Sequence, residues 1–451
     1  MFDDDEDLIG DDGDDTDLLT AEEKAKVSVK DASFSDPQVM YAFYQRLFPW
    51  RQLFQWLNHS PIPSNDFMHR EFAFTLQNEA YLRYQSFPTF ETLRKEVLRL
   101  NPSRFEIGPV YSANPRDRKA LRKAVFKPIN KELVFDIDLT DYDDVRTCCD
   151  KANICEKCWQ FITVAIKIMD VALREDLGFK HIMWVYSGRR GAHAWVCDKK
   201  ARQMDDGKRK AVAAYLEVIR GGAQGGKRVH LRRPLHPHLT RSMDVLKDSF
   251  TTDVLINQDP WREPEKSARL LHLISDKTIT EALREKWNSE PSRSSVKKWA
   301  DIDEVAKSGI SRHLNVQQLR ENKQDIVFEY LYPRLDVEVS KHLNHLLKSP
   351  FVVHPGTGRV CVPIDATRPE DFDPLSVPTV TQLLAEIDAT TGEEKMADYE
   401  KTSLKPYVDF FKRFVAALVK DETTAVKRER EKEEAARAAA AGPGMAAEME
   451  F

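Results

Sequence analysis

Residues 132–138 read ELVFDID, and this stretch decides the fold class of the chain. Its four apolar residues predict a buried β-strand. Side chains two residues apart in a strand project from the same face, so the carboxylates of Asp136 and Asp138 should lie side by side. Two adjacent anions repel each other unless a cation neutralises them, and Mg²⁺ prefers carboxylate and phosphate oxygens. The alternative interpretation is a solvated strand end, because three further aspartates follow by residue 144.

A second motif, residues 184–198 (WVYSGRRGAHAWVCD), predicts a β-hairpin. Two β-rich arms flank Ser187–Gly191, where the glycines permit a tight turn and let backbone N–H groups approach a ligand. Arg189 and Arg190 offer fork-shaped donors for phosphate oxygens, and His193 stands inside the apolar arm after the turn. The alternative is a solvent-facing hairpin tip whose arginines bind a partner.

A third motif, residues 332–355 (YPRLDVEVSKHLNHLLKSPFVVHP), alternates apolar and acidic residues at its start. This alternation predicts a strand on which Asp336 presents a third carboxylate. His345, Lys348 and His354 follow closely. A lysine and two imidazoles beside an acidic strand suit a triphosphate held by a metal ion. Taken alone, Lys348 is better explained as an ordinary surface lysine.

Four of the six cysteines lie within residues 148–158, in the spacing CC-x5-C-x2-C. Four thiolates fill a tetrahedral Zn²⁺ shell and leave no position for water, so the predicted site is structural. The alternative is a set of free buried thiols. The other two cysteines, at positions 197 and 361, are isolated and should lie in the core. The predicted zinc ligands are Cys148, Cys149, Cys155 and Cys158.

Composition and charge narrow the class of protein. Of the 451 residues, 41% are hydrophobic and 31% are charged, which is typical of a soluble globular protein. No apolar run approaches the ~18 residues of a membrane span, and the acidic N-terminus does not resemble a secretory signal. Residues 1–23 hold twelve acidic and no basic residues, so 68 basic residues face 61 acidic ones in the rest. The body of the chain is therefore modestly basic, which permits a polyanionic ligand.

The pattern along the chain predicts an α+β fold, a mixed-sheet catalytic core interrupted by a helical insertion. Residues 38–60, 379–389 and 405–420 should be helical, and residues 331–339 and 352–364 should be strands. The glycine-rich stretch 221–227 (GGAQGGK) lacks the hydroxyl and the strand of a phosphate-binding loop, so it predicts a flexible loop. The expected organisation is an acidic disordered tail (1–25), the first part of the core (26–207), a helical insertion (208–326), the second part with C-terminal helices (327–425) and a charged, Ala-rich tail (426–451).

Taken together and in this order, the four motifs resemble the catalytic small subunits of eukaryotic DNA primases, of the archaeo-eukaryotic primase family. The resemblance runs from about residue 38 to about residue 400. It implies two Mg²⁺ or Mn²⁺ ions at Asp136, Asp138 and Asp336, and a zinc knuckle at the four cysteines. The nucleotide contacts that it implies are Ser187, Arg189, Arg190, His193, Lys348 and His354, with His345, Leu346 and Leu347 near the base and sugar.

The resemblance extends to residues 70–87 (REFAFTLQNEAYLRYQSF). This stretch is similar to a family segment whose glutamate, tyrosine and arginine matter for activity, and they fall on Glu71, Tyr81 and Arg83. A basic position of the family falls on Arg104 within NPSR. Glu71 is accordingly expected among the catalytic residues, and the other three among the nucleotide contacts.

The function implied by the resemblance is the synthesis of short RNA primers on single-stranded DNA by two-metal nucleotidyl transfer. The implied partners are ribonucleoside triphosphates, the large iron–sulfur subunit of primase, and the catalytic and accessory subunits of DNA polymerase alpha. The implied location is the nucleus. The alternatives are a two-metal phosphodiesterase or nuclease, a non-catalytic zinc-bearing nucleic-acid-binding module, and a translesion primase-polymerase. The last is disfavoured by the knuckle beside the ELVFDID strand.

Overall fold

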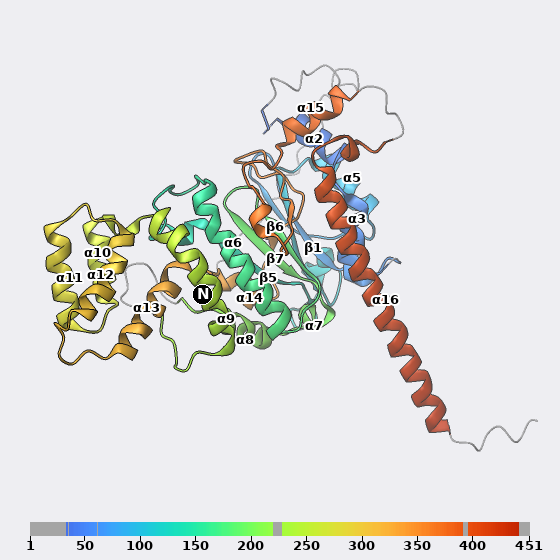
Figure 1. The fold of residues 1–451 in the computed structure, drawn as a ribbon. Helices are drawn as coiled ribbons and strands as arrows, with labels where there is room; N and C mark the ends of the chain where they lie inside the picture. The colour runs from blue at the N-terminus through green and yellow to red at the C-terminus, as the bar shows by residue number, and fades with distance from the viewer. Residues whose placement is uncertain (1–32, 35, 61, 220–227, 391–395, 442–451) are drawn as a thin grey trace, which may run out of the picture.

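The computed structural model describes residues 33–34, 36–60, 62–219, 228–390 and 396–441 (Figure 1). The predicted acidic tail (1–25) and the predicted loop (221–227) lie outside the described residues. Two antiparallel sheets form the centre of the molecule, and helices cover them. The fold is therefore a mixture of helices and antiparallel sheets. Among the described residues, no helix is both long enough and apolar enough to cross a membrane.

The first sheet contains the ELVFDID segment (132–138) and the hairpin motif (184–198). Its strands are β5 (Leu133–Asp138), β7 (Gly191–Val196), β6 (Ile182–Tyr186) and β9 (Pro363–Ile364), in that order across the sheet. The predicted strand at residues 132–138 and the predicted hairpin are both confirmed. β5 pairs with β7 so that Asp136 lies opposite His193 and Asp138 lies opposite Gly191.

The two faces of this sheet are covered differently. On one face lies α6 (Glu156–Val171), where Asp170 accepts a hydrogen bond of 3.1 Å from the indole of Trp184. On the other face, Trp56 packs edge-to-face against Trp195 of β7, with ring centroids 5.2 Å apart. Trp56 belongs to α3 (Trp50–Asn58), which packs beside α16 (Lys405–Ala441).

The second sheet has the order β2 (Tyr81–Gln85), β1 (Arg70–Thr75), β3 (Arg104–Tyr111) and β4 (Pro128–Asn130). The two-residue strand β8 (Leu347–Lys348) also pairs with β3, placing Lys348 opposite Glu106. β8 therefore carries the third motif of the sequence onto the second sheet. The remaining helices beside the sheets are α2 (Pro37–Arg46), α4 (Asn65–Met68), α5 (Phe90–Leu100), α7 (Lys199–Arg202) and α15 (Val380–Ala389).

Helices dominate the described residues between positions 206 and 331, as the sequence predicts. The helices of the α10–α12 group lie at the end of the molecule farthest from the sheets (Figure 1). In contrast, Arg209 of α8 is fully buried and donates to the backbone carbonyls of Lys131 and Glu132, just before β5. The division into a core and an insertion subdomain stays a prediction. The helices are α8 (Asp206–Leu216), α9 (Pro237–Ser249), α10 (Pro264–His272), α11 (Lys277–Ser289), α12 (Ser295–Lys307) and α13 (Val316–Leu331).

The predicted strand at residues 331–339 is wrong. Leu331 ends α13, and Asp336 is the N-cap of the short helix α14 (Val337–Lys341). The alternation of apolar and acidic residues imitates a strand, but the Asp336 carboxylate accepts a hydrogen bond of 3.0 Å from the N–H of Glu338. That bond satisfies a free N–H of the first helical turn, so capping decides the local structure.

Three other expected elements differ in extent. The strand predicted at residues 352–364 is wrong over most of its length, because only β9 and isolated bridges such as Val353–Val360 form. His354-Pro355-Gly356 begins a turn that the apolar run conceals, and prolines and glycines interrupt strands. The helix predicted at residues 38–60 divides into α2 and α3 at Pro49. The last helix, α16, continues to Ala441 and projects away from the body (Figure 1).

Candidate active site

Three carboxylates approach one another on the face of β5 that is turned away from α6. Alternation along the strand directs Asp136 and Asp138 to this face, while Phe135 and Ile137 are completely buried on the other. The backbone N–H of Asp336 donates to the carbonyl oxygen of Asp136 at 3.1 Å. The third carboxylate of the sequence argument therefore lies beside the first two.

These carboxylates destabilise one another's charged forms. Burial and the negative charges of Asp138 and Asp336 together raise the pKa of Asp136 to about 7. The pKa of Asp141 is raised to about 6 by burial and by the same two neighbours. Lys348 acts in the opposite direction on Asp136. A divalent cation would remove this repulsion, so the donor set fits Mg²⁺ or Mn²⁺.

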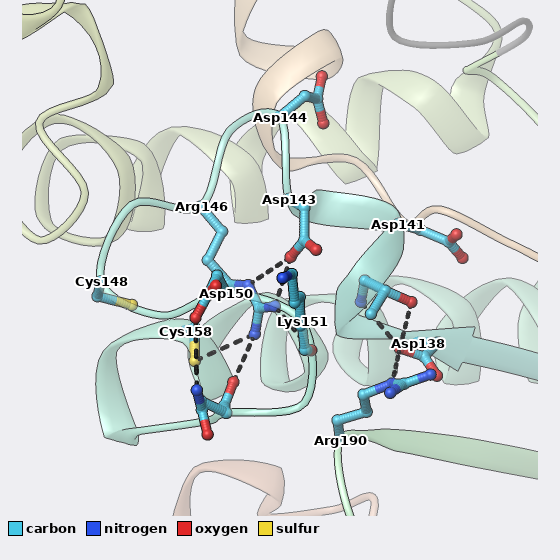
Figure 2. Close-up of polar contacts among 12 residues, drawn as sticks. Asp138, Asp141, Asp143, Asp144, Arg146, Cys148, Asp150, Lys151, Cys158 and Arg190 are labelled. Carbon is cyan, nitrogen blue, oxygen red and sulfur yellow. Dashed lines mark hydrogen bonds and ion pairs between the residues drawn. The ribbon is translucent and has the colours of Figure 1, made fainter.

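Arg190 and Thr140 hold the Asp138 carboxylate. Nε of Arg190 lies 2.8 and 2.9 Å from its two oxygens, and the Thr140 N–H and hydroxyl each donate to it at 2.8 Å (Figure 2). The hairpin can approach this closely because position 191 is glycine. A Cβ atom at Gly191 would lie 2.3 Å from the carbonyl oxygen of Ile137.

A group of cations faces the carboxylates. Nζ of Lys348 donates to the carbonyl oxygen of Ser187 at 3.3 Å, which joins β8 to the hairpin turn. The Ser187 hydroxyl in turn accepts from the Gly191 N–H at 3.1 Å. Lys348, Arg189, Arg104 and Arg190 all lie close enough to His354 for their charges to lower its pKa. The structure thus gathers basic residues from both sheets around one imidazole.

His354 and His193 are held as neutral rings. Burial and the neighbouring cations together lower the pKa of His354 to about 3. Burial and Lys348 lower the pKa of His193 to about 3 as well. Nδ1 of His354 accepts a hydrogen bond of 3.0 Å from the N–H of Gly356, so the neutral ring carries its proton on Nε2. Nε2 of His193 lies 3.4 Å from a carboxylate oxygen of Asp136.

The second sheet contributes an ion-paired layer beside this group. The Tyr81 hydroxyl donates to Glu106 at 2.6 Å, and Arg104 lies 3.9 Å from the same carboxylate. Arg83 pairs with Glu71 at 3.0 Å. The side chain of Glu71 is 0% exposed and also accepts hydrogen bonds from the Tyr84 N–H and the Tyr111 hydroxyl, at 3.2 and 3.0 Å.

His345 lies between the two sheets. Burial lowers the pKa of His345, and the charges of Asp336 and Glu106 act in the opposite direction. The carbonyl oxygen of His345 accepts a hydrogen bond from the buried Lys131 ammonium. Leu347 is buried in β8 opposite Ile107 of β3. This segment, with Leu346 half-buried between them, connects the carboxylates to the second sheet.

The structure therefore brings together most of the predicted site, but the individual roles stay predictions. Glu71 differs from the other predicted residues because its side chain is completely buried. It accepts a hydrogen bond from Arg83 and leaves none of its surface open to a substrate. Sequence reasoning missed Glu106, Lys131 and Thr140. A signal exists only for Thr140, because Asp138-Leu-Thr fits a turn in which an aspartate accepts from the residue two positions later.

The four clustered cysteines form a separate candidate metal centre. One sulfur from each of Cys148, Cys149, Cys155 and Cys158 lies within 4.8 Å of all the others, and within the described part of the chain no other group of three or more Cys, His, Asp or Glu residues does so. The carboxylates of the active site are thus farther apart than the thiols. The described sulfurs suit a tetrahedral S₄ shell. Cys197 and Cys361 are buried in the core, as predicted.

Hydrogen bonds to sulfur favour the thiolate form of Cys158, while the bond with Cys158 raises the pKa of Cys148 and burial raises that of Cys149. A bond with the Cys148 thiol, the Cys155 N–H and the Arg146 guanidinium together lower the pKa of Cys158 to about 5. Arg146 is buried and ion-paired with Asp143 (Figure 2). Gln258, from the segment after α9, accepts from the N–H groups of Thr147 and Cys148 at 2.8 and 3.2 Å and donates to the Cys148 sulfur at 3.4 Å.

Comparison with known proteins gives a consistent result. The family model described as DNA primase small subunit matches residues 135–366. The DNA primase small subunit of Schizosaccharomyces pombe is 56% identical over 421 residues, covering 88% of this chain and 92% of that protein. That of Saccharomyces cerevisiae is 46% identical over 408 residues, covering 90% and 97%. The DNA primase small subunit PriS of Pyrobaculum aerophilum is 30% identical over 151 residues, covering 33% and 47%.

Proposed function

The chain belongs to the DNA primase small subunit family, and we propose that the three carboxylates and the facing cations form its nucleotidyl-transfer site. As a member of this family, the chain is the catalytic subunit of a primase and makes RNA primers. The observation that supports the location is the hydrogen bond between the Asp336 N–H and the Asp136 carbonyl oxygen. It joins two widely separated motifs at one point.

Asp136, Asp138 and Asp336 would hold two Mg²⁺ or Mn²⁺ ions. When bound, such ions lower the pKa of an attacking 3′-hydroxyl and stabilise the charge on the α-phosphate and the leaving pyrophosphate. The raised pKa of Asp136 supports this assignment, since the carboxylates stand close together without a counter-charge for each of them. Such unfavourable placement is typical of a functional site.

Arg189, Arg190, Lys348 and His354 would bind the triphosphate. His354 presents its Nε2–H as a donor, because Gly356 occupies Nδ1. Arg190 pairs with Asp138 and would exchange that carboxylate for a phosphate oxygen when the nucleotide and its cations arrive. His193 would donate a hydrogen bond to a phosphate oxygen, and Ser187 would contact the nucleotide at the hairpin turn.

The second sheet would complete the nucleotide site. Tyr81, Arg83 and Arg104 are candidates for contacts to the nucleotide, and His345–Leu347 for contacts to the base and sugar. We assign Glu71 the role of positioning Arg83, since two hydrogen bonds of 3.0 and 3.4 Å join them and Glu71 is inaccessible.

The cysteine cluster would hold one structural Zn²⁺, and the helices between α8 and α13 would form an insertion subdomain. The family name implies a larger partner subunit. We propose that this partner is an iron–sulfur subunit and that both act with the catalytic and accessory subunits of DNA polymerase alpha in the nucleus. Single-stranded DNA would be the template and ribonucleoside triphosphates the substrates.

Primer synthesis on a homopolymer template with labelled ribonucleotides tests the proposal. The wild type should produce a ladder of short products, and the double variant Asp136→Ala/Asp138→Ala should produce none while remaining folded. Near-normal synthesis by the double variant would reject the carboxylate assignment. Degradation of the template by the wild type would instead indicate a nuclease, and binding without either reaction a non-catalytic module. A matched variant, Asp244→Ala on the exposed side of α9, should be fully active.

A further inference from the structure

A strongly basic segment precedes β4 at the edge of the second sheet. Residues 115–127 (PRDRKALRKAVFK) contain six basic residues and one acidic residue. We call this the basic segment. Its basic side chains are exposed except for that of Arg118, which is half-buried. The basic residues are Arg116, Arg118, Lys119, Arg122, Lys123 and Lys127.

The basic segment is fixed to the sheet and presents its charges from a defined backbone. The Ser112 hydroxyl accepts from the N–H of Lys127 at 3.0 Å and donates to the carbonyl oxygen of Val125 at 2.5 Å. The ring of Phe126 stacks on that of Tyr111, with centroids 4.1 Å apart and planes 4° from parallel. Tyr111 is the last residue of β3, the strand that begins at Arg104.

The basic segment is also continuous with the proposed nucleotide site. The guanidinium of Arg118 lies 4.0 Å from the ring centroid of Tyr84, and that of Arg83 lies 4.9 Å from the same centroid. Arg83 pairs with Glu71 in the layer beside the active site. The two guanidinium groups therefore share one aromatic ring, which connects the basic segment to the layer beside the active site.

The charges at the far end of the segment have no carboxylate partner among the described residues. Among the residues that the structure describes, no carboxylate lies within 4.0 Å of the side chains of Arg122, Lys123 or Lys127. Val125 and Ile129, 55% and 53% exposed, alternate with these cations. Spaced cations with exposed apolar groups between them suit a flexible polyanion that has apolar faces, which describes a single nucleic-acid strand.

We propose that the basic segment binds the phosphodiester backbone of the single-stranded template next to the nucleotide site. This inference rests on the proposed function, since it takes the polyanion to be the template of primer synthesis. An acidic peptide is also negatively charged, but it has no bases that could pack against the exposed Val125 and Ile129. Continuity with Arg83 also favours a ligand that must pass the active site.

The test is the triple variant Arg122→Ser/Lys123→Ser/Lys127→Ser. Each phosphate contact that is lost should reduce the slope of log K against log salt concentration by about 0.7, and so by about 2 in total. Affinity for a fluorescent oligo(dT) should fall at least 10-fold near 0.1 M salt, measured by fluorescence anisotropy. The KM for template should rise, while the KM for nucleotide should stay unchanged.

The control removes the same charges elsewhere. Arg284→Ser/Lys297→Ser/Lys307→Ser changes one arginine and two lysines at exposed positions of α11 and α12, at the other end of the molecule (Figure 1). It should leave both the affinity and the salt slope at wild-type values. If both triple variants lose the same affinity for oligo(dT), the effect comes from net charge and not from the basic segment, and the proposal is overturned.

The outcomes separate this inference from the proposed function. If the wild type makes primers but the basic-segment variant binds and uses template as well as the wild type does, the inference is wrong and the proposed function stands. If the wild type binds oligo(dT) through the basic segment but makes no primers, the proposed function fails instead. The basic-segment variant could instead lose affinity for a peptide of residues 1–23 and keep its affinity for the template. That result would identify the basic segment as a docking site for an acidic peptide and would overturn the proposal that it binds the template.

Discussion

Replacing Asp136 with asparagine should stabilise the metal-free protein while abolishing primer synthesis. The Asp136 carboxyl has its pKa raised to about 7 by burial and by the charges of Asp138 and Asp336. Asparagine has nearly the same shape and no charge, so it removes the cause of the repulsion. A residue kept for catalysis at the expense of stability shows this combination, whereas a purely structural residue loses stability when it is replaced.

The pKa shift sets the size and the pH dependence of the effect. In the unfolded chain the pKa of Asp136 lies near 3.8, so between pH 4 and 7 only the folded protein binds the proton. Wild-type stability therefore falls as the pH rises through this window and is lowest above pH 7. A shift of about 3 units corresponds to about 4 kcal/mol at pH 8, and to about 2 kcal/mol at pH 5. The side chain is 27% exposed, so we expect roughly half of these values.

Thermal melts in buffer without added Mg²⁺ or Mn²⁺ measure this effect. Asp136→Asn should melt a few degrees above the wild type at pH 8, and its advantage should shrink toward pH 5. Added Mg²⁺ should raise the melting temperature of the wild type and not of the variant. Asp244→Asn removes a carboxylate that is 75% exposed and should change none of these values.

Two results would refute this reasoning. A variant that melts below the wild type at pH 8 would mean that the Asp136 charge stabilises the metal-free fold. An advantage of the same size at every pH would mean that the gain does not come from titration of this carboxyl. In either case the proposed cation site would lose its electrostatic support.

Three further predictions concern the hairpin, the imidazole and the cysteine cluster. Gly191→Ala should lower the melting temperature sharply, because its Cβ would lie 2.3 Å from the Ile137 carbonyl oxygen. Gly309→Ala meets no atom within 4 Å and should cost only the strain of its left-handed backbone (φ +75°), about 1–2 kcal/mol. His354→Ala should raise the KM for nucleotide about 10- to 100-fold in steady-state assays without a change in melting temperature. Gln258→Ala should speed the removal of zinc by a colorimetric chelator severalfold, and Gln258→Glu should restore part of the wild-type rate, because it keeps an acceptor for the N–H groups of the knuckle.

Local patterns were sufficient to predict the first sheet and its carboxylates. The run at residues 132–138 has the apolar residues of a buried strand, and the hairpin at 184–198 combines two β-rich arms with turn glycines, so period and turn chemistry agree there. Two-residue spacing places Asp136 and Asp138 on one face with no tertiary information. The cysteine cluster was equally accessible, because its ligands lie within eleven residues.

The errors arose where tertiary contacts or capping outweigh periodicity. Leu335–Val339 alternates like a strand, yet the carboxylate of Asp336 caps a helix and its N–H pairs with β5. The sequence also does not show that Glu71 is buried and accepts hydrogen bonds from Arg83, Tyr84 and Tyr111, and its catalytic role stays a prediction. Gly108, whose Cβ would lie 3.0 Å from that of Glu71, shows how tightly the second sheet closes over this side chain. Pattern alone contains neither fact.

The charge balance of the site implies that cations and nucleotide bind together. In the metal-free protein the three carboxylates face three permanent cations, Arg189, Arg190 and Lys348, while burial keeps His193 and His354 neutral. Two divalent ions alone would add four positive charges beside these groups, and a triphosphate alone would add about four negative charges beside the carboxylates. Arrival of both leaves the total unchanged and frees Arg190 from Asp138 to bind a phosphate. Each ligand should therefore tighten the binding of the other by the same factor.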